Sequence, residues 1–149
     1  MIASGDGPSK SVRVPVRDGL LAGDLEQLDR VRLSGTKCQG CGEVSLGRNA
    51  TCPNCGGNAV AEVALSDHGV LWSYTVVRNR PPGDYKGKDP FVPFGLGLVE
   101  LPDGIRVLSP LDVEITSLKI GMPVKFRAFV QHVDAEGRDV VAFNFVPVG

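Results

Sequence analysis

Four cysteines in one short segment constrain this chain more than any other feature of its sequence. Cys38 and Cys41 form one C-x2-C pair, Cys52 and Cys55 form a second, and ten residues separate the pairs. These are all of the cysteines in the chain. Two residues between cysteines let both sulfurs point at one ion, and four thiolates complete the tetrahedral coordination of zinc. The spacing therefore predicts a closed, structural metal site with zinc as the expected ion.

The sequence alone leaves other states of these thiols open. A rubredoxin-type iron, two disulfides or free buried thiols would use the same residues. The segment 1–11 has no apolar stretch of the kind that directs secretion, and no later run approaches the length of a membrane span. We therefore expect a cytoplasmic chain, in which thiols stay reduced and a metal is favoured over disulfides.

Short strands and turns dominate the rest of the pattern. The 149 residues include 19 glycines and 11 prolines, which favour turns over long helices. Asp24 can cap one short helix, in which Leu25, Leu28 and Val31 would share a face. After the cysteines, apolar and β-branched runs separated by turns predict a compact barrel. The runs lie at 59–65, 69–77, 94–101, 105–111, 111–115, 124–133 and 140–148.

These patterns predict a mainly β protein in three parts. We expect a flexible N-terminal segment at 1–23, with a short edge strand at 12–16. A short helix and a zinc ribbon should occupy 24–58, and the barrel 59–149. One loop, at 78–93, interrupts the rhythm with four prolines, two glycines and four basic residues. Loops of this length inside a compact domain are usually functional or disordered.

The sequence shows no recognisable group of catalytic residues, such as a nucleophile with an adjacent base. The cysteines are assigned to the metal, and His68 and His132 stand apart from any nucleophile motif. Asp112 and Glu114 would share one strand face, but exposed paired carboxylates are usually solvated. The sequence contains neither a phosphate-binding loop nor a dinucleotide fingerprint. We therefore expect that this chain does not catalyse a reaction alone.

The order of these features resembles a known family. A short helix and a ribbon with CxxCG and CPxCG turns precede GVLWSYTVV at 69–77, PFGLGLVEL at 93–101 and IGMPV at 120–124. This order is similar to that of bacterial and archaeal proteins that join a rubredoxin-like zinc ribbon to an OB-fold. These proteins were long described as a domain of unknown function and are associated with acyl-CoA enzymes. The resemblance covers about 25–146 and implies that the barrel is an OB-fold.

The resemblance implies an accessory subunit of a hetero-oligomeric enzyme whose partner holds the catalytic residues. The partner would be a thiolase-type acyltransferase, or instead an acyl-CoA hydratase or aldolase of steroid side chains. Coenzyme A or acyl-CoA would then be a ligand of the complex. The short chain and abbreviated N-terminus are similar to the small subunit of the thiolase that cleaves benzoylsuccinyl-CoA in anaerobic toluene breakdown.

The loop at 78–93 offers groups suited to coenzyme A. Its nucleotide end calls for cations, and its pantetheine arm calls for a narrow, mostly apolar slot. We expect contact with coenzyme A or the partner from Arg78, Arg80, Tyr85, Lys86, Lys88, Phe91 and Phe94. The alternative is a solvated charged loop with Phe91 packed into its own barrel.

Two further functions remain alternatives. Trp72 and Tyr74 could stack on bases in a nucleic-acid-binding OB-fold. A net charge of -1, a pI near 6.1 and 6% aromatic residues argue against that class, so we expect no nucleic-acid partner. The other alternative is a redox protein whose four thiolates hold iron.

Overall fold

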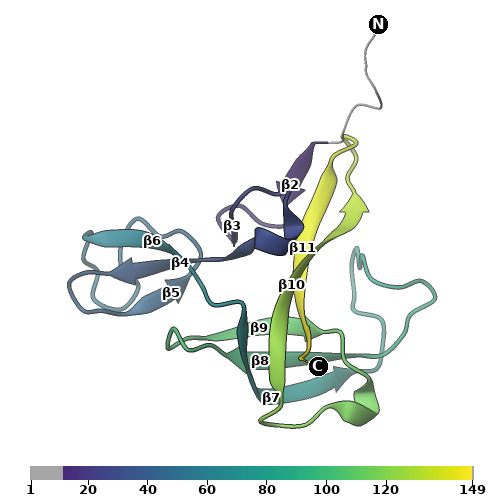
Figure 1. Ribbon diagram of the computed structural model, residues 1–149. Helices are drawn as coiled ribbons and strands as arrows, with labels where there is room; N and C mark the ends of the chain where they lie inside the picture. Colours follow the sequence, from purple (N-terminus) through teal and green to yellow (C-terminus); the bar gives the residue numbers. More distant parts are fainter. Residues whose placement is uncertain (1–11, 149) are drawn as a thin grey trace, which may run out of the picture.

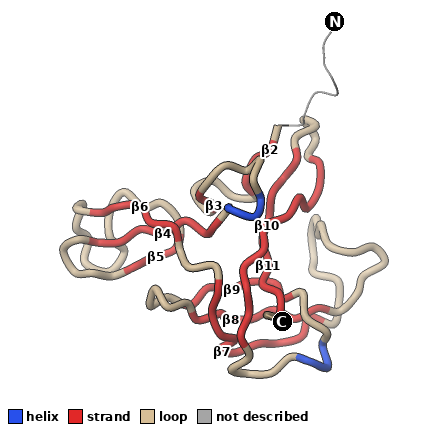
Figure 2. Tube along the Cα trace, in the orientation of Figure 1, coloured by secondary structure: helices blue, strands red, loops and turns tan. Residues whose placement is uncertain are grey.

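The computed structural model describes residues 12–148 and consists of strands and turns with two short 3-10 turns (Figure 2). A small sheet carries the cysteines and projects from one side of a barrel (Figure 1). The predicted mainly β fold is confirmed. Within 12–148, no helix has the length and apolar character needed to cross a membrane.

The small sheet is built on strand β4 (Arg32–Cys38). Its two antiparallel neighbours in the ribbon are β5 (Val44–Leu46) and β6 (Val60–Ala64), and β3 (Leu21–Ala22) pairs with its first residues. The Thr36 hydroxyl, which is almost fully buried, donates to the Gly47 carbonyl at 2.6 Å and accepts the Asn49 amide at 3.0 Å. This hydroxyl fixes the loop that leads to the second cysteine pair, and the sheet itself extends to residue 64.

The barrel contains five strands and closes on itself. The strands are β7 (His68–Val77), β8 (Phe94–Glu100), β9 (Arg106–Leu111), β10 (Pro123–Val133) and β11 (Asp139–Pro147). Their order is β7-β8-β9-β11-β10, and β10 pairs back with β7. Strand β2 (Arg13–Pro15) adds to β11 in parallel at the sheet edge. A barrel is therefore confirmed, but two of the runs expected in it are not barrel strands. Residues 60–64 form β6 of the ribbon sheet, and 112–114 follow β9 without a strand and lead into a 3-10 turn, η2 (Ile115–Ser117). Of the segment expected to be flexible, 1–11 lies outside the described residues.

Side chains alternate between the inside and the outside of the barrel. In β9, Val107, Ser109 and Leu111 point inward and are buried, while the residues between them are exposed. The facing positions of β8 include Gly97, which leaves room for these side chains. A Cβ atom there would lie 2.7 Å from Leu71 Cδ1 and 2.8 Å from Leu111 Cδ1. The repeated glycines in FGLGL are therefore required by the small interior of the barrel.

One hydrophobic core joins the ribbon sheet to the barrel. Val31, Leu33 and Leu65 are nearly fully buried and belong to the same cluster as Leu71 and Val99 of the barrel. Polar contacts support the same junction: the Ser66 amide donates to Asp103 Oδ1 at 3.0 Å, and Arg32 pairs with Asp67 at 3.2 Å. The ribbon is thus anchored at its root, while its cysteine end extends away from the barrel (Figure 1).

The predicted helix beginning at Asp24 is wrong. This stretch contains only a 3-10 turn, η1 (Leu28–Arg30), before β4 begins. Asp24 Oδ1 accepts the Glu26 amide at 2.9 Å in a local turn. Two arginine side chains bond carbonyls of this stretch: Arg13 donates to the Leu25 carbonyl, and Arg32 to the Val31 carbonyl. The apolar spacing still serves the core, because Val31 is buried there, but eight residues between Gly23 and β4 leave little length for a helix.

Candidate functional site

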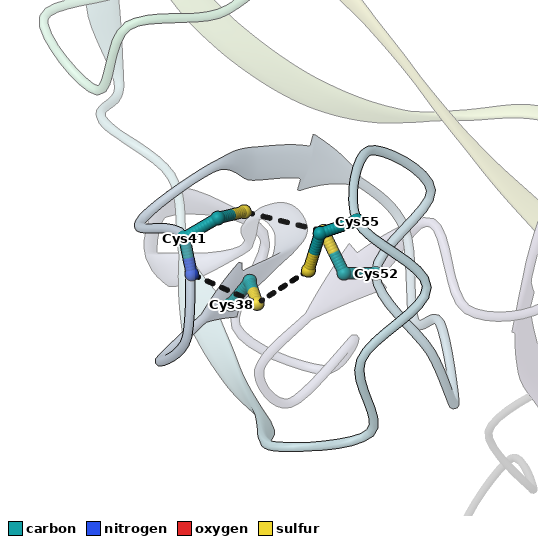
Figure 3. A group of neighbouring side chains, drawn as sticks. All are labelled: Cys38, Cys41, Cys52 and Cys55. Carbon is teal, nitrogen blue, oxygen red and sulfur yellow. Dashed lines mark hydrogen bonds between the residues drawn. The ribbon is translucent and has the colours of Figure 1, made fainter.

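The four cysteine side chains converge at the far end of the ribbon sheet (Figure 3). Cys38 ends β4, Cys41 follows in the turn, and the second pair lies in the loop before β6. All four sulfurs lie within 4.8 Å of one another. The Cys38–Cys55 and Cys41–Cys52 sulfurs are each 3.6 Å apart. Zinc–sulfur bonds of about 2.3 Å in a tetrahedron place sulfurs about 3.8 Å apart, so the donor set fits a metal ion.

Each cysteine pair sits in a similar turn. A glycine with positive φ follows the second cysteine of each pair: Gly42 at 80° and Gly56 at 77°. Their amides donate to the carbonyls of Cys38 and Cys52, at 2.9 and 2.8 Å. An L side chain resists this backbone conformation, which explains the glycine after each C-x2-C.

Amide donors surround the sulfurs. The Cys41 amide donates to Cys38 Sγ at 3.4 Å, and the Asn54 amide to Cys52 Sγ at 3.3 Å. The Asn54 side chain also reaches across to the other pair, where Nδ2 donates to Cys41 Sγ at 3.6 Å. Such donors stabilise sulfur in its thiolate form, which is the form that binds a metal.

The thiols influence each other's ionisation. The Cys41 amide lowers the pKa of the Cys38 thiol to about 6. The Gly57 amide also lowers the pKa of Cys55, but the three neighbouring thiols outweigh it and raise that pKa to about 11. Four thiolates this close repel one another, so a bound cation is the natural means of holding all of them ionised. A site with four sulfur ligands leaves no open coordination position and is structural.

The loop at 78–93 gathers its aromatic side chains into one cluster. The Tyr85 ring lies 5.8 Å from that of Phe91 and 6.1 Å from that of Phe94, and the two phenylalanine rings are 6.2 Å apart. The Arg80 guanidinium lies over Tyr85 at 5.4 Å. Phe91 therefore packs against other loop and strand-end rings, and the loop has a packed centre of its own.

A pocket of about 730 Å³ separates this loop from the barrel wall. Four residues expected from the sequence line it, Tyr85, Lys86, Lys88 and Phe94, whereas Arg78, Arg80 and Phe91 do not. The sequence prediction missed the opposite wall, which β10, β11 and the segment after β9 provide. Its residues include Asp112, Glu114, Arg127, Phe129, Gln131, Phe143 and Asn144. The one available signal was Asn144, a polar residue inside the apolar run VVAFNFVPV.

Arg127 organises the polar part of that wall. Its Nη2 donates to Asp112 Oδ2 at 2.9 Å, and its Nε donates to Asn144 Oδ1 at 3.2 Å. The guanidinium also lies 5.5 Å from the centre of the Phe129 ring. Asp112 is thus held by an arginine, and Glu114 lies separately on the pocket rim. The two carboxylates do not form an acid–base pair.

The histidines offer no catalytic arrangement. His68 Nδ1 lies 3.0 Å from Asp67 Oδ1 and 3.3 Å from Ser66 Oγ. Both neighbours meet the same ring nitrogen, whereas a catalytic triad needs the acid and the nucleophile on opposite nitrogens. His132 Nδ1 lies 3.0 Å from Gln131 Oε1, its neighbour in the sequence, and the described residues place no nucleophile beside the ring. In the described part of the chain, neither histidine is placed to activate a nucleophile.

Comparison with known proteins gives the same architecture. Residues 62–130 match the family described as ChsH2, C-terminal OB-fold domain. A DUF35 domain-containing scaffold protein of Pyrococcus furiosus is 32% identical over 123 residues, covering 80% of this chain and 86% of that protein. One of the same description from Methanothermobacter thermautotrophicus is 34% identical over 119 residues, covering 78% and 85%.

Two further relatives belong to enzymes. The chain is 23% identical over 114 residues to benzoylsuccinyl-CoA thiolase subunit BbsA of Thauera aromatica, covering 76% of this chain and 74% of that subunit. A solved structure titled Ltp2-ChsH2(DUF35) aldolase superposes with a TM-score of 0.61 at 26% identity, covering 82% of this chain and 89% of that chain. With its OB-fold barrel, its four-cysteine ribbon and this degree of identity, the chain belongs to the DUF35 family.

Proposed function

We propose that this chain is a non-catalytic accessory subunit of a hetero-oligomeric, thiolase-type acyl-CoA enzyme. It supports assembly of the complex and coenzyme A or acyl-CoA binding at the partner's active site. Thiolytic cleavage of benzoylsuccinyl-CoA is the candidate reaction, because a subunit of that thiolase is among the relatives. The proposal places the chain in the cytoplasm, where the cysteines stay reduced.

The observation that carries this proposal is the loop at 78–93 and the pocket beside it. The loop brings Lys86, Lys88 and the Tyr85–Phe94 ring pair to one side of a pocket of about 730 Å³. Ligand pockets in proteins commonly measure about 300 to 1,000 Å³. Cations suit phosphates, and aromatic walls suit a thin apolar arm, so the combination favours a coenzyme A thioester over a purely polar ligand.

The metal site supports an accessory role. We propose structural zinc held by the four cysteines, because the sulfur geometry suits a tetrahedral ion. A bound zinc ion would supply folding free energy to the ribbon and no reactive position. The described residues then contain no free thiol to act as a nucleophile, so bond-making is assigned to the partner.

A second candidate is a partner that is an acyl-CoA hydratase or aldolase. The structural likeness to the chain titled Ltp2-ChsH2(DUF35) aldolase favours it. Both candidates share the accessory role and the coenzyme A ligand, and they differ in the reaction that the partner catalyses.

The outer face of the barrel gives little support to a nucleic-acid-binding function. Trp72 is 45% exposed, but the Arg106 guanidinium lies over one side of its ring at 3.9 Å, and Arg106 is paired with Glu100 at 3.0 Å. Leu108, which is 59% exposed, lies on the same face as Arg106. A stacking platform for bases requires open rings in a basic groove, and this face offers a ring that already stacks on an arginine, an arginine paired with a carboxylate, and an aliphatic side chain.

Purification of the tagged chain from its native host, followed by mass spectrometry, tests the proposal. We expect a thiolase-like chain to co-purify in a fixed ratio and the complex to act on coenzyme A thioesters. An aldolase or hydratase as the only partner would select the second candidate. Turnover of a thioester by the homogeneous chain alone, or recovery of RNA or DNA without an enzyme, would overturn the accessory role.

A further inference from the structure

The pocket wall contains a buried side-chain amide with an unused donor. Asn144 is 8% exposed and lines the pocket. Its Oδ1 accepts the Arg127 Nε at 3.2 Å, which fixes the orientation of the carboxamide. Within 12–148, its Nδ2 has no hydrogen-bond partner. Leaving a buried N–H group without a partner is unfavourable, so this donor points to a ligand that carries an acceptor.

The surroundings of Asn144 restrict the shape of that ligand. Phe129 lines the pocket on the barrel side, with the Arg127 guanidinium 5.5 Å from its ring centre, and the nearly parallel Tyr85 and Phe94 rings line it on the loop side. Phe143 also lines the pocket, but its ring stacks on Phe126 of the barrel interior. These walls favour a thin or flat apolar body. Gln131 is a second carboxamide among the lining residues that β10 and β11 provide, so two amide groups and the Phe129 ring share this wall.

The charges near the pocket restrict the ligand further. Arg127 is paired with Asp112, and Lys86 is paired with Asp84. Lys88 lines the pocket and forms no ion pair among the described residues. Glu114 also lines the pocket and forms no ion pair among the described residues, so the barrel side carries one unpaired carboxylate and the loop side one unpaired cation. This arrangement suits an uncharged chain whose phosphate end extends toward the loop and away from Glu114.

We propose that this pocket binds a thin chain that carries amide carbonyl groups, of the pantetheine type, with Asn144 Nδ2 donating to one carbonyl. Pantetheine has two amides, aliphatic flanks and a phosphate at one end when it is part of coenzyme A, and so it matches all three features. The inference rests on the proposed function, and adds that this chain builds the slot itself from its barrel wall. Asn144 and Arg127 then set its specificity.

Titration of the 15N-labelled full chain tests this directly, because the Asn144 side-chain amide gives its own NMR signals. We expect pantetheine and coenzyme A to shift the Asn144 Nδ2 signals and the backbone amides of residues 85–88, and 3′,5′-ADP to leave the Asn144 signals unchanged. Asn144→Asp keeps the side-chain shape and the Arg127 contact but replaces the donor by an acceptor. We expect it to weaken pantetheine binding about tenfold or more.

Asn58→Asp, at an exposed asparagine of the ribbon, is the matched control and should bind as the unchanged chain does. Should Asn144→Asp lose its dispersed amide spectrum, Thr116→Trp fills the same pocket from an exposed position and must abolish binding. Undiminished binding by a folded variant, absence of pantetheine binding, or an Asn144 shift with 3′,5′-ADP alone overturns the inference. The accessory role would survive these outcomes, since co-purification with a partner is read independently.

Discussion

At the scale of single residues, side chains outside the ligand set decide how tightly the metal is held. Asn54 is exposed, yet its side chain donates to Cys41 Sγ at 3.6 Å and its backbone amide donates to Cys52 Sγ. It thus links one cysteine of each pair through a single residue. Groups in this position orient the ligands and disperse thiolate charge.

Asn54→Ala should therefore weaken zinc binding while leaving all four ligands in place. We expect a loss of about tenfold in affinity, because removal of such an outer partner typically costs 10- to 100-fold. Competition of the zinc-loaded chain with a chromogenic chelator measures it. Gln39→Ala, at an exposed position between the first two cysteines, is the control. Equal zinc release from both variants would show that the Asn54 side chain does not act on the metal.

Gly97 makes an equally local contribution inside the barrel. An added methyl group would press on Leu71 and Leu111, whose Cδ1 atoms would lie 2.7 and 2.8 Å from it. Gly97→Ala should lower the free energy of unfolding by about 1–3 kcal/mol, the usual cost of overpacking. Urea denaturation measures the change. Leu108→Ala, on the exposed side of the same sheet, should cost less than about 0.5 kcal/mol. A Gly97→Ala variant as stable as the parent would mean that the interior has spare room.

At the scale of elements, sequence patterns predicted strands well where alternation and turn chemistry agreed. The hairpin at 94–111 and the cysteine turns are examples, because each depends on local residues. The helix at Asp24 failed because its apolar spacing is equally satisfied by a turn that buries Val31, and the decisive partners, Arg13 and Arg32, lie outside the stretch. Local periodicity could not reveal those contacts.

The ribbon and the barrel should also respond differently to metal loss. The cysteine end of the ribbon has few apolar residues of its own, whereas the barrel encloses a continuous core. Cys52→Ser should lose its metal and the ribbon structure and keep the barrel partly intact. Zinc content together with the fluorescence of Trp72, the single tryptophan and part of β7, separates the two elements. Retention of a full equivalent of metal by Cys52→Ser would contradict this prediction. Complete loss of the native Trp72 fluorescence in the metal-free variant would contradict it too, because the barrel would then have unfolded with the ribbon.

At the scale of the whole molecule, one wall of the pocket could be predicted from the sequence and the other could not. The loop wall was evident from its prolines, cations and rings in one continuous stretch. The barrel wall combines Asp112, Arg127 and Asn144 from three separate segments, and only the closure of β11 against β10 and β9 brings them together. A pattern read along one chain contains no signal for such long-range pairings.

The loop provides the last test, on the assembled complex. Arg80→Glu with Lys88→Glu reverses two charges on the loop, of which Lys88 lines the pocket and Arg80 lies over the Tyr85 ring. Both residues are exposed, so the barrel should stay folded. If these cations attract the phosphates of coenzyme A, the KM for the thioester should rise by about tenfold or more, with kcat less affected, and the effect should shrink as salt is added. Arg17→Glu with Lys119→Glu, at exposed positions outside the loop, makes the same change in net charge and controls for it. Kinetics that match the control would remove the loop from substrate binding and leave the subunit as a scaffold alone.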